Sequence, residues 1–270
     1  MQPMVNIALR AARVAGEQIV RAVERLDLIK TDAAEVTKLL SDTCKKAELS
    51  IVHTIQKAYP QHRVVGEYTG EHPAQAETTE FTWYINPIDS ISNFSNGLPV
   101  FAISMAGQQK NKIEHALILN PITGEEFTTS RGKGAQLNGK RLRVSSHKTI
   151  EQSLIGTGFF NRTSDKNHLD AYLDIFRAMT LAGGTIYNGG SPALNLAYTA
   201  AGRIDGFYQI GLNQWEMEAG ILLVQEAGGL VGDFSGNNQF RDTGHLVAAN
   251  PKMFKALLQH LKPCLTESLK

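Results

Sequence analysis

The sequence has few cysteines, little net charge and no long hydrophobic run, and each absence excludes a class of protein. Its two cysteines, Cys44 and Cys264, are far apart and lack CxxC spacing, which argues against a disulfide framework or a zinc site and favours a reducing cytoplasm. The net charge is only +1, so nothing indicates a nucleic-acid stripe or a patch for anionic membranes. No run approaches about 18 apolar residues, and arginines interrupt the N-terminal apolar pattern. We therefore expect a protein that is neither secreted nor membrane-spanning.

The composition is that of a soluble globular protein. The chain has 270 residues, of which 42% are hydrophobic and 20% are charged, enough to bury an extensive core. No internal repeat or low-complexity segment divides it. We predict one domain over 1–270, made of two intimately packed lobes at approximately 1–150 and 151–270.

The N-terminal third is predicted to be mainly helical. Apolar residues at helical spacing indicate one amphipathic helix over 4–25 and a second over 42–59. The second helix is expected to bury Leu49 and Val52 and to expose Glu48. Residues 27–42 carry much charge with weak periodicity, so they are predicted to form a loop or a mobile hairpin.

The rest of the chain interleaves strands and helices. Short apolar stretches bounded by Gly, Pro or Asn predict strands, and turn signals over 120–144 predict hairpins. Longer periodic segments predict helices, so the fold class is α/β. The predicted strands are 63–66, 81–85, 100–107, 114–121, 153–159 and 204–210, and the predicted helices are 166–182, 191–202, 215–229 and 251–261.

One stretch, "WYINPIDSISNF" at 83–94, carries the chemical signal. Asp89 stands where a carboxylate at the end of a strand could hold a cation, but the residue three positions earlier is Asn86, an amide. A lone Pro-x-Asp after an apolar strand is more often a turn than a metal site. The interpretation of this stretch therefore depends on its wider sequence context.

That context resembles the inositol monophosphatase superfamily, specifically its bacterial SuhB branch. Five segments match in the family's order and spacing: "YPQHRVVGE", "WYINPIDSISNF", "NPITGEEFTTSRGKGAQLNG", "ALNLAYTAAGRIDGF" and "WEMEAGILLVQEAGG". The resemblance implies a layered αβαβα sandwich and a homodimer. It also implies a Mg²⁺-dependent phosphomonoesterase, in which carboxylates hold metal ions that polarise the phosphate and activate water.

Carried over residue by residue, the resemblance gives a set of metal-site positions. Three family acids are kept as acids, although the last is one methylene longer than the family aspartate. The aspartate that bridges two metals in the family is an amide here. The expected metal positions are Glu67, Asn86, the Ile88 carbonyl, Asp89 and Glu216. The resemblance thus implies a weakened Mg²⁺ site that holds one ion or none.

The positions that handle water and substrate also depart from the family. The threonine that orients the attacking water is Ile91, and its aspartate partner falls on Cys44, so no catalytic pair is intact. The backbone N–H groups of Ser90 and Ile91 are expected to bind phosphate at a helix start. A glutamate that contacts substrate hydroxyls in the family is Gln209.

Three further residues need a less specific interpretation beside the functional one. Cys44 taken alone is typical of a small buried helix residue. Trp215 is more typical of a core than of a ligand contact. Glu218 stands where the family has a small residue, so it is either a surface change or a side chain that fills part of the vacated pocket.

Two functions from different classes follow. The first is a SuhB-like protein with an impaired active site and a binding or regulatory role, such as transcription antitermination with RNA polymerase and Nus factors, which the family resemblance implies. The alternative is a Mg²⁺-dependent inositol-1-monophosphatase of reduced activity, acting on a small phosphomonoester. Because the losses at Cys44 and Ile91 affect both halves of one catalytic pair, the first is favoured.

Overall fold

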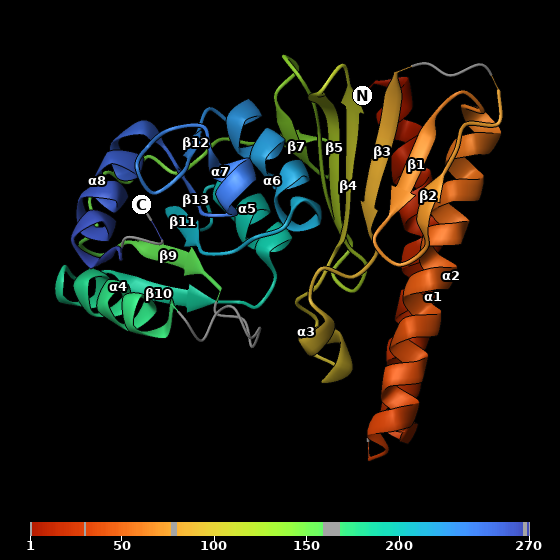
Figure 1. The fold of residues 1–270 in the computed structure, drawn as a ribbon, viewed down its shortest axis with the longest axis horizontal. Coiled ribbons are helices and arrows are strands. Elements are labelled where there is room, and N and C mark those ends of the chain that lie inside the picture. The colour runs from red at the N-terminus through yellow and green to blue at the C-terminus, as the bar shows by residue number, and fades with distance from the viewer. Residues whose placement is uncertain (1, 30, 77–79, 159–167, 267–268, 270) are drawn as a thin grey trace.

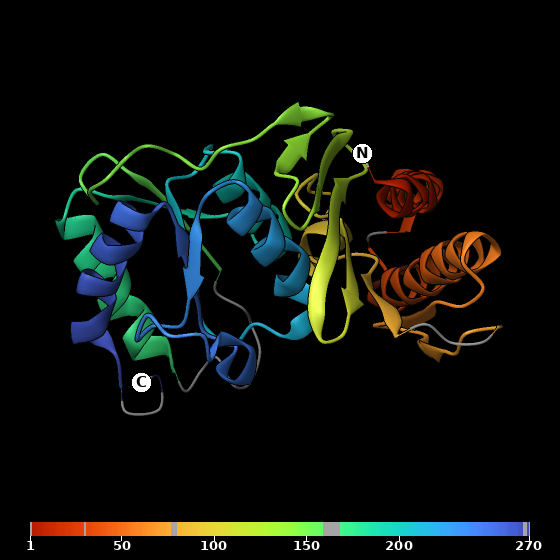
Figure 2. The ribbon, with the colours of Figure 1, turned by 90° about the horizontal axis from the view of Figure 1, so that it is seen from above.

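The computed structural model has five layers of alternating helices and sheets. It describes residues 2–29, 31–76, 80–158, 168–266 and 269. Two long helices cover the outer face of a first sheet, two helices lie between this sheet and a second one, and two more cover the far side of the second sheet (Figures 1 and 2). The αβαβα sandwich expected from the family resemblance is confirmed.

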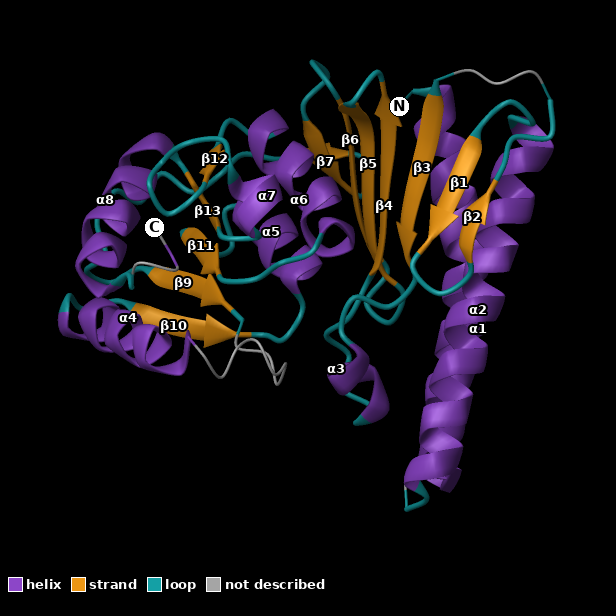
Figure 3. Ribbon diagram, in the orientation of Figure 1, coloured by secondary structure: helices purple, strands orange, loops and turns teal. Residues whose placement is uncertain are grey.

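The first sheet has eight strands in the order β2-β1-β3-β4-β5-β6-β7-β8. Strand β1 is parallel to β3, and the other neighbours are antiparallel (Figure 3). The strands are β1 (Arg63–Gly66), β2 (Gly70–His72), β3 (Phe81–Asn86), β4 (Ile103–Gln109), β5 (Lys112–Asn120), β6 (Glu125–Ser130), β7 (Ala135–Leu137) and β8 (Lys140–Arg141).

The second sheet has five strands in the order β10-β9-β11-β13-β12, so β10 and β12 are its edges. Strands β10, β9 and β11 run parallel, and β13 is antiparallel to both β11 and β12. The strands are β9 (Leu154–Thr157), β10 (Thr185–Asn188), β11 (Gly206–Gln209), β12 (Leu230–Gly232) and β13 (Leu246–Ala249). The expected strand over 153–159 is thus shorter, and residue 159 lies outside the described residues.

The helices divide among the three helical layers. The two long N-terminal helices form the outer layer, α5 and α6 the middle one, and α4 and α8 the layer beyond the second sheet. Residues 166 and 167 of the expected helix 166–182 lie outside the described part of the chain. The bounds are α1 (Pro3–Ile29), α2 (Ala33–Ala58), α3 (Ile91–Ser95), α4 (Leu169–Leu181), α5 (Pro192–Ala200), α6 (Gln214–Glu226), α7 (Phe240–Thr243), α8 (Pro251–Leu261) and the 3-10 helix η2 (Lys262–Cys264).

The predicted loop over 27–42 is wrong, because most of this segment is helical. Helix α1 runs to Ile29 and α2 begins at Ala33. Helix α2 starts here because Asp32 is its N-cap. The Asp32 carboxylate accepts hydrogen bonds from the N–H groups of Ala34 and Glu35. Four of the charged residues that obscured the periodicity, Asp32, Glu35, Lys38 and Asp42, are exposed.

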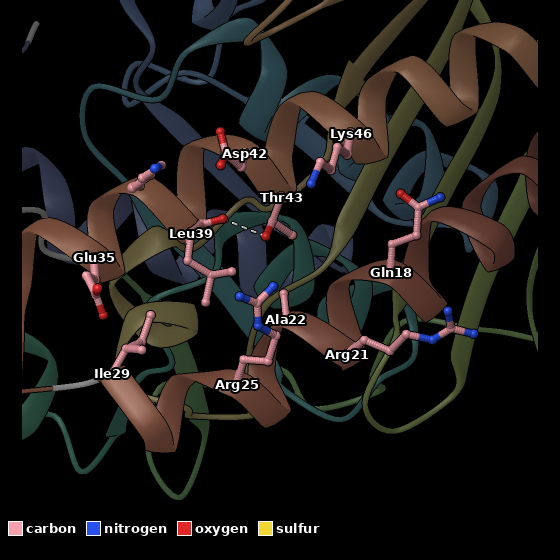
Figure 4. Close-up of a pocket in the computed structure, with 11 residues that line it drawn as sticks. Gln18, Arg21, Ala22, Arg25, Ile29, Glu35, Leu39, Asp42, Thr43 and Lys46 are labelled. Atoms are coloured by element: carbon pink, nitrogen blue, oxygen red, sulfur yellow. Dashed lines mark hydrogen bonds between the residues drawn. The ribbon is translucent and has the colours of Figure 1, made fainter.

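The two long helices leave a groove between them. Between α1 and α2 lies a cavity of about 450 Å³ (Figure 4). Its apolar floor includes Ala22 and Leu39, and charged side chains rim it. The charged residues are Arg21, Arg25, Glu35, Lys38, Asp42 and Lys46. Both signs are present, as on a solvated helical face.

The predicted burial of α2 is right at Val52 and wrong at Glu48 and Leu49. Glu48 is fully buried and Leu49 is 51% exposed, the reverse of the expectation. The true buried stripe contains Cys44, Glu48, Val52 and Ile55, which share one side of the helix at spacings of four, four and three. The carboxylate tolerates burial because backbone N–H groups of the β1–β2 turn donate to it.

The middle layer depends on one glycine. A Cβ atom added to Gly220 of α6 would lie 2.4 Å from the Leu196 Cβ atom of α5, closer than such atoms approach. Glycine at this position therefore lets the two helices pack closely between the sheets. Among the described helices, none is both long and apolar enough to cross a membrane.

A buried histidine gives the stability of the first sheet a pH dependence. His62 stacks between Tyr59 and Phe81, and its Nδ1 accepts a hydrogen bond from the Trp83 indole N–H. Burial, and then the charge of His115, lower its pKa from 6.5 to about 4. Between these two values the unfolded chain binds the proton and the folded chain does not. The stabilisation by neutral His62 is therefore fully present above pH 6.5 and is lost as the pH falls toward 4.

We expect this loss to be measurable by comparison with a His62→Phe variant. The free energy of unfolding of the natural protein, relative to the variant, should fall by about 1–2 kcal/mol between pH 7.5 and pH 5. Urea titrations at both pH values measure it. The comparison is needed because Asp89, whose pKa is raised, contributes with the opposite sign in both proteins. An equal pH dependence in the two proteins would show that His62 is not the group responsible.

Candidate functional site

Asp89 is held by the protein at the junction of the first sheet and α5. It lies after the end of β3 and is 93% buried. One carboxylate oxygen accepts the Ala102 N–H at 2.7 Å. The other accepts the Ser191 hydroxyl and the Ala193 N–H, at the start of α5. Both oxygens of the expected metal ligand thus already bind protein donors.

The charge state of Asp89 reflects this environment. Burial raises the pKa of its carboxyl from 3.8 to about 7, against the opposing effect of the hydrogen bonds from Ser191, Ala102 and Ala193. The nearby negative charge of Glu216 raises the pKa further. Two of the expected metal ligands, Asp89 and Glu216, therefore lie close enough to affect each other.

Glu216 caps the start of α6. Its Oε2 accepts the Asn213 N–H at 2.9 Å, and its own N–H donates to Asn213 Oδ1 at 3.2 Å. This reciprocal pair is a capping box, which satisfies two N–H groups at the helix start. The longer glutamate side chain at this family position thus has a structural function.

Asn86 and Ile88 form a local turn. The Asn86 Oδ1 accepts the Ile88 N–H at 3.1 Å, and both residues are buried. Such an Asx turn uses the amide oxygen that occupies the family's metal-bridging position. It also fixes the backbone that leads to Asp89.

The Ser90 and Ile91 positions start the short helix α3. Its first backbone hydrogen bond runs from the Phe94 N–H to the Ser90 carbonyl, so the N–H groups of Ser90 and Ile91 precede the hydrogen-bonded turn. The Ile91 side chain is exposed, which leaves an apolar surface where the family has the water-orienting hydroxyl.

Cys44 forms a second group with residues of the β1–β2 turn. Its thiol lies close enough to the Tyr68 hydroxyl for the two groups to affect each other's pKa. Burial raises the pKa of the thiol to about 12, and the negative charges of Glu48 and Glu67 also raise it. The thiol is therefore protonated at neutral pH, which is typical of a structural cysteine and not of a nucleophile. Glu67 lies near this group and is exposed at the turn.

Gln209 ends β11 in a fully buried position. Neither its side-chain oxygen nor its nitrogen has a hydrogen-bond partner among the described residues. A buried, unsatisfied amide is costly unless something binds it. Gln209 packs tightly against Gly158. A Cβ atom added to Gly158 would lie 2.5 Å from the side-chain oxygen of Gln209.

Glu218 and Trp215 have clearer roles than the sequence allowed. Glu218 is buried and forms a two-point ion pair with Arg241 of α7, at 2.6 and 3.0 Å. It is therefore not a plain surface change. Trp215 is half-buried and packs edge-on against Tyr84 of β3.

The donor set fits Mg²⁺ in kind but not in number. Mg²⁺ prefers oxygen ligands, and Asp89, Glu216, the Asn86 amide and the Ile88 carbonyl supply oxygens. Over the part of the chain that the structure describes, however, no group of three or more His, Cys, Asp or Glu residues is placed to hold a metal ion. The residues therefore do not fit a complete Mg²⁺ centre with several carboxylates.

Sequence reasoning missed three functional neighbours of these residues. Ser191 donates to Asp89, Tyr68 lies beside Cys44, and Glu48 accepts hydrogen bonds from the turn that carries Glu67. A signal existed for two of them. Ser191 precedes Pro192 at a helix start, a typical capping pattern, and Glu48 is four residues from Cys44.

The layers and the Asp89 junction define an αβαβα sandwich of the sugar-phosphatase type. The sequence profile of the inositol monophosphatase family matches residues 1–266, and the chain belongs to this family. Members of the family are generally Mg²⁺-dependent phosphatases.

Comparisons with individual proteins agree with this assignment. The chain is 49% identical over 270 residues to "Nus factor SuhB" of Pseudomonas aeruginosa and 40% identical over 270 residues to "Nus factor SuhB" of Escherichia coli K12, with full coverage of both chains in each case. The crystal structure of "extragenic suppressor protein suhB" from Bartonella henselae is similar with a TM-score of 0.84 and 33% identity, covering 97% of this chain and 100% of that one. The predicted SuhB branch is thus confirmed.

Proposed function

We propose that the chain is a SuhB-like binding protein that acts in transcription antitermination with RNA polymerase and Nus factors. The observation that carries this proposal is the 49% identity, over the full length of both chains, to a relative named as a Nus factor. A partner recognises surfaces, so such a role requires the fold and does not require an intact set of catalytic carboxylates. A cytoplasmic location is part of the same proposal.

We further propose that its phosphatase site is impaired. The water-orienting positions are Cys44 and Ile91, a protonated thiol and an alkyl group that cannot activate water. The remaining ligands, Glu67, Asn86, the Ile88 carbonyl, Asp89 and Glu216, would hold one Mg²⁺ weakly or none. The N–H groups of Ser90 and Ile91, and the buried amide of Gln209, would still contact a phosphomonoester or another small anion.

The alternative function is a Mg²⁺-dependent inositol-1-monophosphatase of reduced activity. The observation that favours it is the closeness of Asp89 and Glu216, which leaves two acids at the family site. Either function is compatible with one domain of two packed lobes and with a homodimer, both of which we also propose.

The binding role predicts that the immobilised protein retains purified RNA polymerase or a purified Nus factor. We expect a variant with the family residues, Cys44→Asp, Asn86→Asp, Ile91→Thr and Glu216→Asp, to retain the same partner equally well, because these side chains lie in or beside a buried site. A pull-down with defined components measures this. Failure to retain polymerase and every Nus factor tested would reject the antitermination role.

A further inference from the structure

A small polar pocket lies between the start of α1 and the strands β6 and β7. Its volume is about 190 Å³. Val5 of α1 lines one wall, and Thr128 and Gln136, which are paired across β6 and β7, line another. Among the described residues that line it, none is acidic and Lys133 is the only cation. The other lining residues are Gln2, Thr129, Ser130 and Gly134.

The hydroxyl group of Thr128 is the feature that points to a ligand. The residue is only 2% exposed, yet its hydroxyl forms no hydrogen bond with a described residue. The neighbouring hydroxyls are engaged: Thr129 donates to the Gly134 carbonyl at 3.1 Å, and Ser130 shares a hydrogen bond of 2.8 Å with Nδ1 of His115. A buried polar group is costly unless something binds it. Thr128 therefore offers an unused donor at the wall of the pocket.

The start of α1 adds a positive field to the pocket. The first backbone hydrogen bond of the helix runs from the Asn6 N–H to the Gln2 carbonyl, and Pro3 has no N–H. The N–H groups of Met4 and Val5 thus precede the hydrogen-bonded ladder. The first turn contains no acidic residue that would neutralise the helix dipole. Since Gln2 and Val5 line the pocket, its wall includes the end of α1 that favours an anion.

Lys133 supplies a full positive charge at the pocket. It lies in the turn between β6 and β7, and the glycines on either side of it donate their N–H groups to Glu226 of α6 at 2.7 and 2.8 Å. Lys133 itself forms no ion pair with a described residue. Glu226 is engaged by the turn, and Glu126 of β6 is paired with Arg13. The charge that remains unpaired at the pocket is therefore positive.

We propose that this pocket binds a phosphate group, either as free phosphate or as the end of a small phosphorylated molecule. The donors come from three elements: the ammonium of Lys133 in the turn, the hydroxyl of Thr128 on β6 and the N–H groups at the start of α1. A phosphate end has three strong acceptor oxygens, so it satisfies donors from several directions at once. A carboxylate has two oxygens in one plane and leaves more of these donors without a partner.

This pocket is separate from the family site. It lies between the first sheet and the outer helical layer, whereas Asp89 binds the start of α5 in the middle layer (Figure 2). None of the expected metal positions is among its lining residues, so phosphate needs no Mg²⁺ to bind here. The inference goes beyond the proposed antitermination role and does not depend on it.

The first experiment measures the binding of inorganic phosphate by calorimetry, in a buffer with a chelator and without Mg²⁺. It compares the natural protein with Thr128→Val, Lys133→Met and Lys140→Met. Lys140 is a matched control, because it is an exposed lysine on the neighbouring strand β8 that does not line the pocket. We expect Lys140→Met to bind like the natural protein. Lys133→Met should raise the dissociation constant at least about tenfold, and Thr128→Val roughly three- to tenfold.

The second experiment separates binding from folding. Valine has the shape of threonine and suits a strand, so Thr128→Val should keep the unfolding midpoint of the natural protein in phosphate-free buffer. Phosphate should then raise the midpoint of the natural protein more than that of Thr128→Val or Lys133→Met. A Thr128→Val variant that is destabilised without phosphate would show that the hydroxyl serves the fold, and the inference would be wrong.

Comparison of ligands identifies the source of the phosphate group. Tighter binding of glycerol 3-phosphate than of inorganic phosphate indicates a small phosphorylated molecule, and the reverse indicates the free ion. Either result supports the inference if Lys133→Met weakens it. Acetate should bind at least about tenfold more weakly than phosphate.

Three results would overturn the inference. They are no binding of phosphate at millimolar concentrations, acetate that binds as well as phosphate, and equal binding of phosphate by all four proteins. The last result would place the anion elsewhere, as at Ser90 and Ile91. None of the three bears on the retention of polymerase or Nus factors, which is measured separately.

Discussion

Restoring the four family residues should raise the hydrolysis of inositol 1-phosphate at least about a hundredfold in kcat/KM. The variant carries Cys44→Asp, Asn86→Asp, Ile91→Thr and Glu216→Asp. A single well-placed catalytic group contributes on the order of 10²–10⁴ in rate, and groups that act as a unit do not add simply. The gain should grow with the Mg²⁺ concentration, because two of the changes restore family metal ligands. Initial rates across a Mg²⁺ titration measure it.

Two partial variants make this test sharper. Cys44→Asp with Ile91→Thr restores only the water-orienting pair, and Asn86→Asp with Glu216→Asp restores only the carboxylates. If the site is impaired as proposed, each should recover less than the full set. If the natural protein already hydrolyses the substrate at the rate of the full variant, the chain is an ordinary phosphatase and the proposal of an impaired site is rejected.

The structure also shows how these changes could disturb folding. Cys44→Asp places a new carboxylate in a buried site that already contains Glu48 and is close to Glu67. The Tyr68 hydroxyl, which lies near the thiol in the natural protein, is a possible donor to this carboxylate. Glu216→Asp shortens one arm of the capping box at α6. Unfolding midpoints must therefore accompany the rates, so that a low rate is not mistaken for a chemical effect.

Patterns that depend on neighbouring residues were predictable from the sequence, and long-range pairings were not. The strand at 81–85 and the helix at 251–261 follow from local apolar patterns bounded by turn residues, and both are found. Helices α1 and α2 extend further into 27–42 than predicted, and in Figure 1 this end of the hairpin runs past the first sheet. The two helices pack on each other there, through Val36, Leu39 and Leu40 of α2, a contact that the weak local periodicity does not show.

The same reasoning applies to the site. The motif order led to Asp89 and Glu216, and the structure brings them together. No local pattern could show that Ser191, 102 positions further along the chain, would hold Asp89, because that pairing exists only when α5 packs against the first sheet. Glu48 was read as exposed because it is charged, although its spacing from Cys44 and Val52 places it on the buried stripe.

That buried carboxylate carries the second large prediction, which concerns stability. The Glu48 carboxylate accepts the N–H groups of Tyr68 at 2.9 Å and Thr69 at 2.7 Å, and so fixes the turn that carries Glu67. Glu48→Ala leaves both N–H groups unsatisfied and opens a cavity in α2. Burial raises the pKa of this carboxyl, which offsets part of its benefit. We expect a net loss of about 2–4 kcal/mol in the free energy of unfolding, measured by urea titration.

A matched control is Glu24→Ala, an exposed glutamate in the other long helix, which should change the free energy of unfolding by less than about 0.5 kcal/mol. Equal effects of the two substitutions would show that the buried carboxylate does not hold the turn.

A double-mutant cycle with Gly66→Ala tests the contact itself. A Cβ atom at position 66 would lie 2.4 Å from Glu48 Oε2, so Gly66→Ala should destabilise the natural protein strongly. In the Glu48→Ala background the alanine methyl group enters vacated space, and the same change should cost less. Thr69 Oγ1, at 2.8 Å from that Cβ position, keeps the relief incomplete. If the two costs are equal, Glu48 is not the group that requires glycine at the turn.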